Sequence, residues 1–139
     1  MDKEKELDIF ARTLYGEARG EGLLGLEAVA NVILNRVKLA KEKRVTWWGD
    51  TISEVCLKPF QFSCWNPNDV NNRIIRQVDE KDAVFRLCQR IARRAAGGFL
   101  TDLTKGATHY HAKVVNPKWA LRQIPIFEYK NHLFYREVA

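Results

Sequence analysis

The segment that decides the fold lies close to the start of the chain and reads LYGEARGEG over residues 14–22. It places two carboxylates, Glu17 and Glu21, where a helical pattern runs into three closely spaced glycines. Glycine costs up to about 1 kcal/mol relative to alanine in a helix interior. The segment therefore predicts a groove or a close approach of backbone. We expect it to pack tightly against the following helix, so that Gly20→Val would crowd the cleft.

An apolar stripe leads into this segment. Glu17 lies beside it, and a half-buried carboxyl can act as a general acid near neutral pH, because desolvation disfavours its anion. Glu17 is therefore the candidate acid. The alternative is that both glutamates are solvated and pair with Arg12 or Arg19. The stripe has the spacing of the buried face of a helix and consists of Leu7, Phe10, Ala11, Leu14 and Ala18.

Composition predicts one domain over residues 1–139, because 46% of the residues are hydrophobic and no linker or repeat interrupts the chain. The first six residues are charged with both signs and no long apolar run follows. We therefore expect neither a secretory signal nor stable membrane insertion, and synthesis in the cytoplasm. The three cysteines lack C-x-x-C spacing, so we expect reduced, packed thiols.

The net charge of +6 predicts attraction to a polyanion. Nucleic acid, an anionic membrane face and the acidic cell-wall polymer of bacteria all fit this charge. The densest basic run, residues 38–44, is most simply the solvated end of a long helix.

The remaining pattern predicts a mainly α fold with a small β hairpin, in the α+β class. A second and stronger stripe over residues 26–40 predicts the central core helix. Thr51 and Glu54 form a capping box for a short helix that begins at Ile52 and ends before Pro59. Residues 61–68 then form a loop. Asp79 is expected to cap a third long helix, which Gly97 and Gly98 end. Short β-prone runs cover 107–111 and 124–129, with a turn at 130–132 into a strand over 133–135.

Two patches have side chains suited to chemistry. The loop from Gln61 to Asn66 interleaves aromatic and amide groups, which suits a glycan cleft, although Phe62 and Trp65 could instead plug the core. In a strand over THYH, residues 108–111, His109 and His111 share one face while Thr108 and Tyr110 share the other, so either pair could line a cleft.

These histidines permit other chemistry. With His132 or Cys64 as a third ligand they could hold zinc, and Glu17 would then activate water. A thiol hydrolase that uses Cys64 and His111 is weaker, because nothing marks Cys64 as a low-pKa thiolate.

Four stretches carry a resemblance, which extends from about Leu7 to Arg136. The stretch ARTLYGEARGEGLLGLEAVANVILNRV, residues 11–37, resembles the opening of the bacterial cell-wall hydrolase family typified by the catalytic domain of spore-cortex-lytic enzymes. The later blocks QFSCW, ATHYH and KNHLFY are similar, in the same order, to blocks of its phage and proteobacterial members.

This resemblance implies a lysozyme-like single domain that cleaves the β-1,4 bond between N-acetylmuramic acid and N-acetylglucosamine as a lytic transglycosylase or muramidase, without cofactor or metal. Glu17 would be the catalytic acid and base, and Glu21 would shape the cleft or orient Glu17. The other expected substrate contacts are Gln61, Phe62, Ser63, Trp65, Thr108, Tyr110 and His111.

The expected partner is the glycan strand of peptidoglycan, bound by a monomer that neither binds nucleic acid nor inserts into the membrane. A bare, basic catalytic domain resembles a phage or prophage endolysin, which reaches the wall after a separate protein permeabilises the membrane. The same-substrate alternative is a zinc N-acetylmuramoyl-L-alanine amidase with His109, His111 and His132 as ligands. The alternative from another class of protein is a basic, non-catalytic nucleic-acid-binding module in which Trp47, Trp48 and Trp65 stack on bases.

Overall fold

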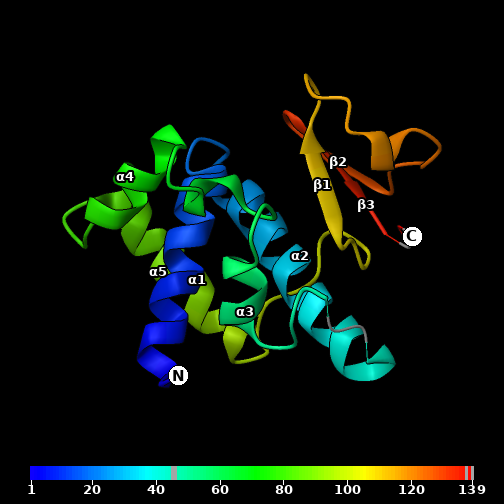
Figure 1. Cartoon of the computed structure of the whole chain (residues 1–139). Coiled ribbons are helices and arrows are strands. Elements are labelled where there is room, and N and C mark those ends of the chain that lie inside the picture. The colour runs from blue at the N-terminus through cyan, green and yellow to red at the C-terminus, as the bar shows by residue number, and fades with distance from the viewer. Residues whose placement is uncertain (45–46, 137, 139) are drawn as a thin grey trace.

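The computed structural model describes residues 1–44, 47–136 and 138, and it combines a group of helices with a small sheet at one side (Figure 1). The expected mainly α fold is confirmed. The helices are α1 (Lys3–Ala18), α2 (Gly22–Lys43), α3 (Ile52–Leu57), α4 (Val70–Gln77) and α5 (Ala83–Ala96), and two 3-10 turns are η1 (Ser63–Trp65) and η2 (Lys118–Ala120).

Helix α1, rather than the expected α2, is the centre of the helical part. It contacts α2, α3, α4, α5 and η1, and all five members of its predicted stripe are buried. Helix α2 lies between the helices and the sheet. Val29 and Ile33 on α2 belong to the main core, whereas Val32 packs in a second cluster with Phe134 of the sheet. Burial on both sides explains the wide apolar stripe of α2.

Three of the four predicted helix boundaries are confirmed. The Thr51 hydroxyl accepts a 3.2 Å hydrogen bond from the N–H of Glu54 at the start of α3, which ends before Pro59, and α5 ends at Gly97. The predicted cap of α5 is wrong, because Asp82 accepts the N–H of Phe85 at 3.0 Å. Asp79 instead accepts the N–H of Lys81 and forms the preceding turn. Helix α4 has no counterpart among the predicted elements.

The sheet consists of β1 (His109–Ala112), β2 (Phe127–Tyr129) and β3 (His132–Tyr135), antiparallel in the order β1-β3-β2. The predicted hairpin is confirmed as β2 and β3, joined at Lys130 and Asn131. The β-prone run at 107–111 adds β1 to it. The expected strand at 124–129 is shorter, and Ile124 is 85% exposed ahead of β2.

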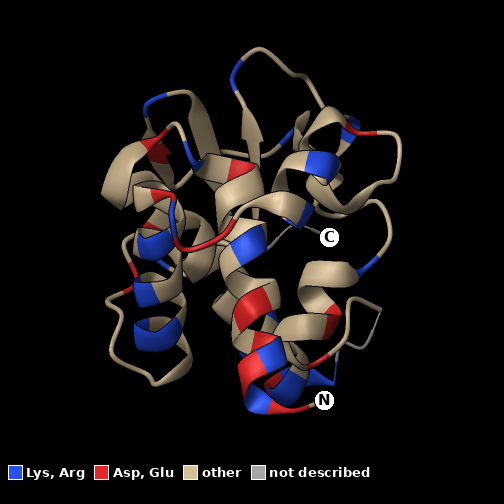
Figure 2. Cartoon of the chain, turned by 90° about the vertical axis from the view of Figure 1, so that its left-hand side faces the viewer, with Lys and Arg blue, Asp and Glu red and all other residues tan. Residues whose placement is uncertain are grey.

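Basic and acidic residues are interspersed over the face shown in Figure 2, so the net positive charge is spread over this surface. The basic run at 38–44 covers the last six residues of α2 and the residue after it, and Lys41 and Lys43 lie in the last turn, where cations are favoured by the helix dipole. The three cysteines are free and buried. Within the described ranges, no helix has both the length and the apolar character needed to cross a bilayer.

Candidate active site

Glu17 lies in the last turn of α1 and is half-buried. Its Oε1 atom accepts a 2.6 Å hydrogen bond from the hydroxyl of Tyr110 on β1. Its Oε2 atom accepts a longer one, 3.3 Å, from the backbone N–H of Cys64 on η1. Donors from two different elements therefore set the direction of this carboxylate.

The two arginines of the alternative interpretation, in which the glutamates are solvated ion-pair partners, are engaged elsewhere. Arg12 binds Asp8 at 2.8 Å and also donates to two backbone carbonyls at the end of α4. Arg19 donates to the side chain of Asn71 at 2.7 Å. The interpretation of Glu17 and Glu21 as partners of Arg12 and Arg19 is therefore wrong.

Glu17 opens onto a cleft of about 300 Å³ between the end of α1, the loop before η1 and the sheet. Such a volume is at the lower end of the range for small-ligand sites. The cleft brings together Gln61, Phe62, Ser63, Tyr110 and His111, all of which were predicted as substrate contacts, and its other lining residues are Arg36, Ala112, Val115 and His132.

Tyr110 is a donor to Glu17 over a wide pH range. Burial raises the pKa of Tyr110 well above its ordinary value, and the neighbouring Glu17 carboxylate raises it further. The phenol therefore stays protonated. Its ring is stacked on Phe134 of β3, which holds the hydroxyl over Glu17.

Arg36 is a buried cation at the back of the cleft. Its Nε donates to the backbone oxygen of Thr108 at 2.7 Å, and one terminal nitrogen donates to Oε1 of Gln61 at 3.1 Å. Its guanidinium also lies 5.0 Å from the ring centre of Trp48 and 5.5 Å from that of Phe62. Burial lowers the pKa of Arg36 to about 10, so it remains charged at neutral pH. Arg36 thus ties the loop before η1 to β1.

The second carboxylate, Glu21, is buried and paired with a histidine. Oε1 of Glu21 lies 2.6 Å from Nδ1 of His132, and its backbone oxygen accepts a 2.9 Å hydrogen bond from Lys130. The His132 ring lies edge-on to Tyr110 with 5.4 Å between ring centres. Glu21 therefore reaches the cleft through His132 and lies outside its lining.

Close backbone approach occurs at Gly16 and not at Gly20. A Cβ atom on Gly16 would lie 2.6 Å from Cβ of Cys64 and 2.8 Å from Cγ2 of Ile75. A Cβ atom on Gly20 would meet nothing within 4 Å, so the expected crowding by Gly20→Val is wrong. The glycine segment packs tightly against η1 and α4 instead of α2.

Two expected substrate contacts lie outside the cleft. The indole N–H of Trp65 donates to the Thr13 hydroxyl at 2.8 Å, and its ring packs on the main core. Thr108 is 6% exposed, and its hydroxyl is within 2.9 Å of Nδ1 of His109. Phe62 lines the cleft but is only 2% exposed, so the alternative of a core plug holds for its ring. With Trp48 also buried, the stacking face of the nucleic-acid alternative is not formed.

The histidines have separate partners. Nε2 of His111 lies 2.8 Å from the Tyr135 hydroxyl, whereas His132 pairs with Glu21. No three His, Cys, Asp or Glu side chains in residues 1–44, 47–136 and 138 gather as metal ligands would, which weakens the zinc alternative. Burial raises the pKa of Cys64, and the nearby Glu17 raises it further. A thiol nucleophile needs a lowered pKa, so this finding opposes the thiol-hydrolase alternative.

A family model described as cell wall hydrolase matches residues 20–135. This chain belongs to the cell wall hydrolase family. Its fold is similar to that of the catalytic domain of the germination-specific lytic transglycosylase SleB from Bacillus anthracis, with a TM-score of 0.73, 27% identity and 97% of each chain covered. The catalytic domain of the Bacillus cereus SleB protein gives the same TM-score and identity over 98% of this chain and 93% of that one. The expected lytic-transglycosylase-like fold is therefore confirmed.

Curated relatives of this cell wall hydrolase are spore cortex-lytic enzymes. The one from Halalkalibacterium halodurans is 29% identical over 134 residues, which are 94% of this chain and 34% of the relative. That of Bacillus cereus is 40% identical over 60 residues, or 43% of this chain and 21% of the relative. The chain thus covers between 21% and 34% of the length of these two relatives.

Sequence reasoning missed four cleft residues of this cell wall hydrolase, of which Arg36 and His132 carry polar groups and Ala112 and Val115 do not. Arg36 lies between Ile33 and Val37 on the buried stripe of α2, and a charged residue in such a stripe indicates an internal partner. His132 had been considered only as a zinc ligand. Its pairing with Glu21, 111 positions earlier in the numbering (132 − 21), left no local signal.

Proposed function

We propose that this cell wall hydrolase is a lytic transglycosylase that cleaves the bond between N-acetylmuramic acid and N-acetylglucosamine in peptidoglycan. The observation that supports this most is that Glu17 is the only carboxylate among the described residues that line the cleft. Glycosidases that activate water use a second Asp or Glu at a defined separation. Glu21 is a poor second carboxylate because His132 binds it.

Glu17 acts first as an acid and then as a base. It donates its proton to the glycosidic oxygen, the bond from C1 to that oxygen breaks, and an oxocarbenium-like centre forms. The C6 hydroxyl of the muramyl residue then attacks C1 while Glu17 takes its proton, which yields a 1,6-anhydro end. Because the Cys64 contact to Oε2 is the longer of the two, Oε2 is the oxygen better placed to carry the proton.

The polar wall of the cleft suits a sugar. The Oε1 atom of Gln61 accepts from Arg36, which leaves the NH₂ group of its amide to meet a hydroxyl or acetamido oxygen. The Ser63 hydroxyl can both donate and accept. Glu21 acts on the reaction through His132, as a positioning residue.

Mass spectrometry of soluble fragments released from purified peptidoglycan tests this function. We expect 1,6-anhydromuramic ends from the parent and a loss of at least about a hundredfold in release with Glu17→Gln, which cannot donate a proton. The exposed Glu80→Gln is the matched control and should leave release unchanged. Reducing sugar ends would indicate a muramidase, and free stem peptides an amidase. No release by the parent would refute the proposal.

We also propose the endolysin-like use, in which the enzyme acts once the membrane has been opened. The net charge of +6 supports binding to an anionic wall, and added salt should weaken that binding. Expression in bacteria with and without a membrane-permeabilising protein tests it. Lysis only in the presence of both proteins is expected, and lysis without the permeabilising protein would contradict it.

A further inference from the structure

Phe60, in the loop between α3 and η1, has a conformation that its residue type avoids. Its backbone φ is +66°, in the left-handed region, and 86% of the residue is exposed to solvent. A bulky side chain in this region is unusual and strained, and an exposed aromatic ring gains little from burial. Strained residues of this kind concentrate at binding sites. The folded state alone gives no reason for a phenylalanine here.

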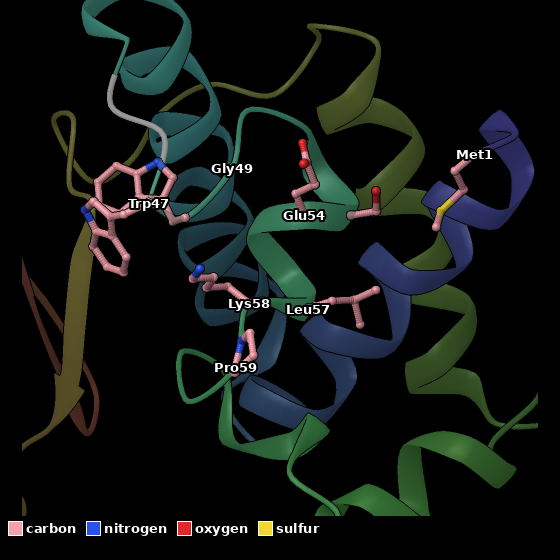
Figure 3. Close-up of a pocket in the computed structure, with 9 residues that line it drawn as sticks. Met1, Trp47, Gly49, Glu54, Leu57, Lys58 and Pro59 are labelled. Atoms are coloured by element: carbon pink, nitrogen blue, oxygen red, sulfur yellow. The ribbon is translucent and has the colours of Figure 1, made fainter.

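A second groove, of about 370 Å³, lies beside this residue along α3 (Figure 3). Figure 3 shows Trp47 on one side of the groove, Leu57 and Met1 toward the other, and Lys58 and Pro59 between them. Trp47 is 49% exposed, so part of its indole is available to a ligand. The groove therefore combines an exposed aromatic ring with the ammonium group of Lys58, which can donate hydrogen bonds.

The groove and the Glu17 cleft are neighbours along the chain, and both contribute a ring to the surroundings of Arg36. Pro59 lines the groove and Gln61 lines the cleft, with Phe60 between them. Trp48 lines the groove and Phe62 lines the cleft. The guanidinium of Arg36 lies over both of these rings. A chain-like ligand that extends from the cleft along the 59–61 loop would meet Phe60 first and then the groove that Trp47 lines.

We propose that Phe60 and Trp47 bind further saccharide units of the same glycan strand whose scissile glycosidic bond lies at Glu17. The inference rests on the proposed function. Aromatic rings cover the apolar face of a pyranose, and Phe62, the phenylalanine that lines the cleft, is only 2% exposed. Lys58 adds hydrogen-bond donors for the hydroxyl and acetamido oxygens of the sugars. The strain at Phe60 is then the cost of presenting a ring to the strand.

Binding is measured in the Glu17→Gln background, so that the strand is not cut. The probe is peptidoglycan glycan strands from which an amidase has removed the stem peptides. We expect Phe60→Ala and Trp47→Ala each to weaken binding by about fivefold to tenfold, the factor that corresponds to about half the burial free energy of one aromatic side chain. Phe99→Ala is the matched control, because Phe99 is 77% exposed and contributes to neither groove nor cleft.

Phe60→Gly separates the ring from the strain. Glycine adopts positive φ freely, so this variant should unfold at higher urea than Phe60→Ala and yet bind strands as weakly. With Glu17 present, the loss of cleavage caused by Phe60→Ala should be larger for long strands than for tetrasaccharides. Phe60→Tyr, which keeps an aromatic ring at this position, should bind strands as the parent does.

Unchanged binding of the peptide-free strands by both alanine variants would overturn the inference. An effect seen only with peptide-bearing strands would assign the groove to the stem peptide and would also overturn the inference. It would be overturned as well if the alanine variants changed only the oligomeric state in gel filtration and left strand binding unchanged. Failure of the proposed function is distinguished from these results, because the parent with Glu17 intact would then release no anhydro fragments.

Discussion

Substitution of Gly16 by alanine tests whether the contact between α1 and η1 positions Glu17, the proposed catalytic acid. The new Cβ would lie 2.6 Å from Cβ of Cys64 and 2.8 Å from its Sγ, so η1 must shift. Overpacking a close-packed site costs about 1–3 kcal/mol, and the better helix propensity of alanine offsets up to about 1 kcal/mol of that. We expect the free energy of unfolding to fall by about 1–2 kcal/mol.

Urea unfolding followed by circular dichroism measures the loss, and we expect the midpoint to fall by about 1 M. Cleavage of peptidoglycan should fall further than the unfolded fraction explains, because displaced Cys64 no longer donates to Oε2 of Glu17. Gly20→Ala is the matched control and should stay within about 0.5 kcal/mol of the parent, since its Cβ meets nothing. Equal stability of the Gly16 and Gly20 variants would refute the close-packing argument.

Tyr110→Phe removes the donor to Oε1 of Glu17, and we expect kcat on peptidoglycan to fall by about tenfold to a hundredfold, the range for a hydrogen bond to a charged group. An undiminished kcat would show that the carboxylate is oriented without it. His109→Gln should flatten the pH dependence of stability, because burial, and then the nearby Arg36, lowers the pKa of His109 from 6.5 to about 4. The unfolded chain takes up this proton near pH 6.5 and the folded one only near pH 4, so the stability present above pH 6.5 is lost as the pH falls to about 4. With allowance for partial exposure, urea titrations at pH 7 and pH 4 should show a parent-specific loss of about 2 kcal/mol, and an equal loss in both proteins would contradict the assignment.

The long helices could be predicted because their apolar spacing depends on local sequence alone. The stripes of α1 and α2 continue over several turns, and Thr51 and Gly97 mark boundaries by local chemistry. Helix α4 was missed because it has eight residues and buries only Asn72 and Ile75. Its signal was the cap, since Asp69 accepts the N–H of Asn71. The cap of α5 was wrongly assigned to Asp79 because the turn before a helix favours the same residue type, aspartate, as the cap itself.

Prediction of the site was limited by partners far away in sequence. Glu17 stood out because a carboxylate beside an apolar stripe needs an explanation. The orientation of Thr108 could not be predicted, because its backbone oxygen accepts a hydrogen bond from Arg36, 72 residues earlier in the chain. Trp65 was expected to face a sugar, but the Thr13 hydroxyl 52 residues earlier holds its indole in the core. Each of these placements depends on tertiary packing, which no local pattern encodes.

The hydrogen bond from Tyr110 to Glu17 joins residues 93 positions apart, which has a consequence for how the protein is made. A growing chain can form every one of the five described α-helices before Tyr110 has been synthesised. Glu17, the proposed acid, is then present, but the Tyr110 hydroxyl that orients its carboxylate is not. Contacts of long sequence separation form late in folding. In a refolding experiment, helical circular dichroism should therefore recover before cleavage does, and the interval between them times the docking of the sheet.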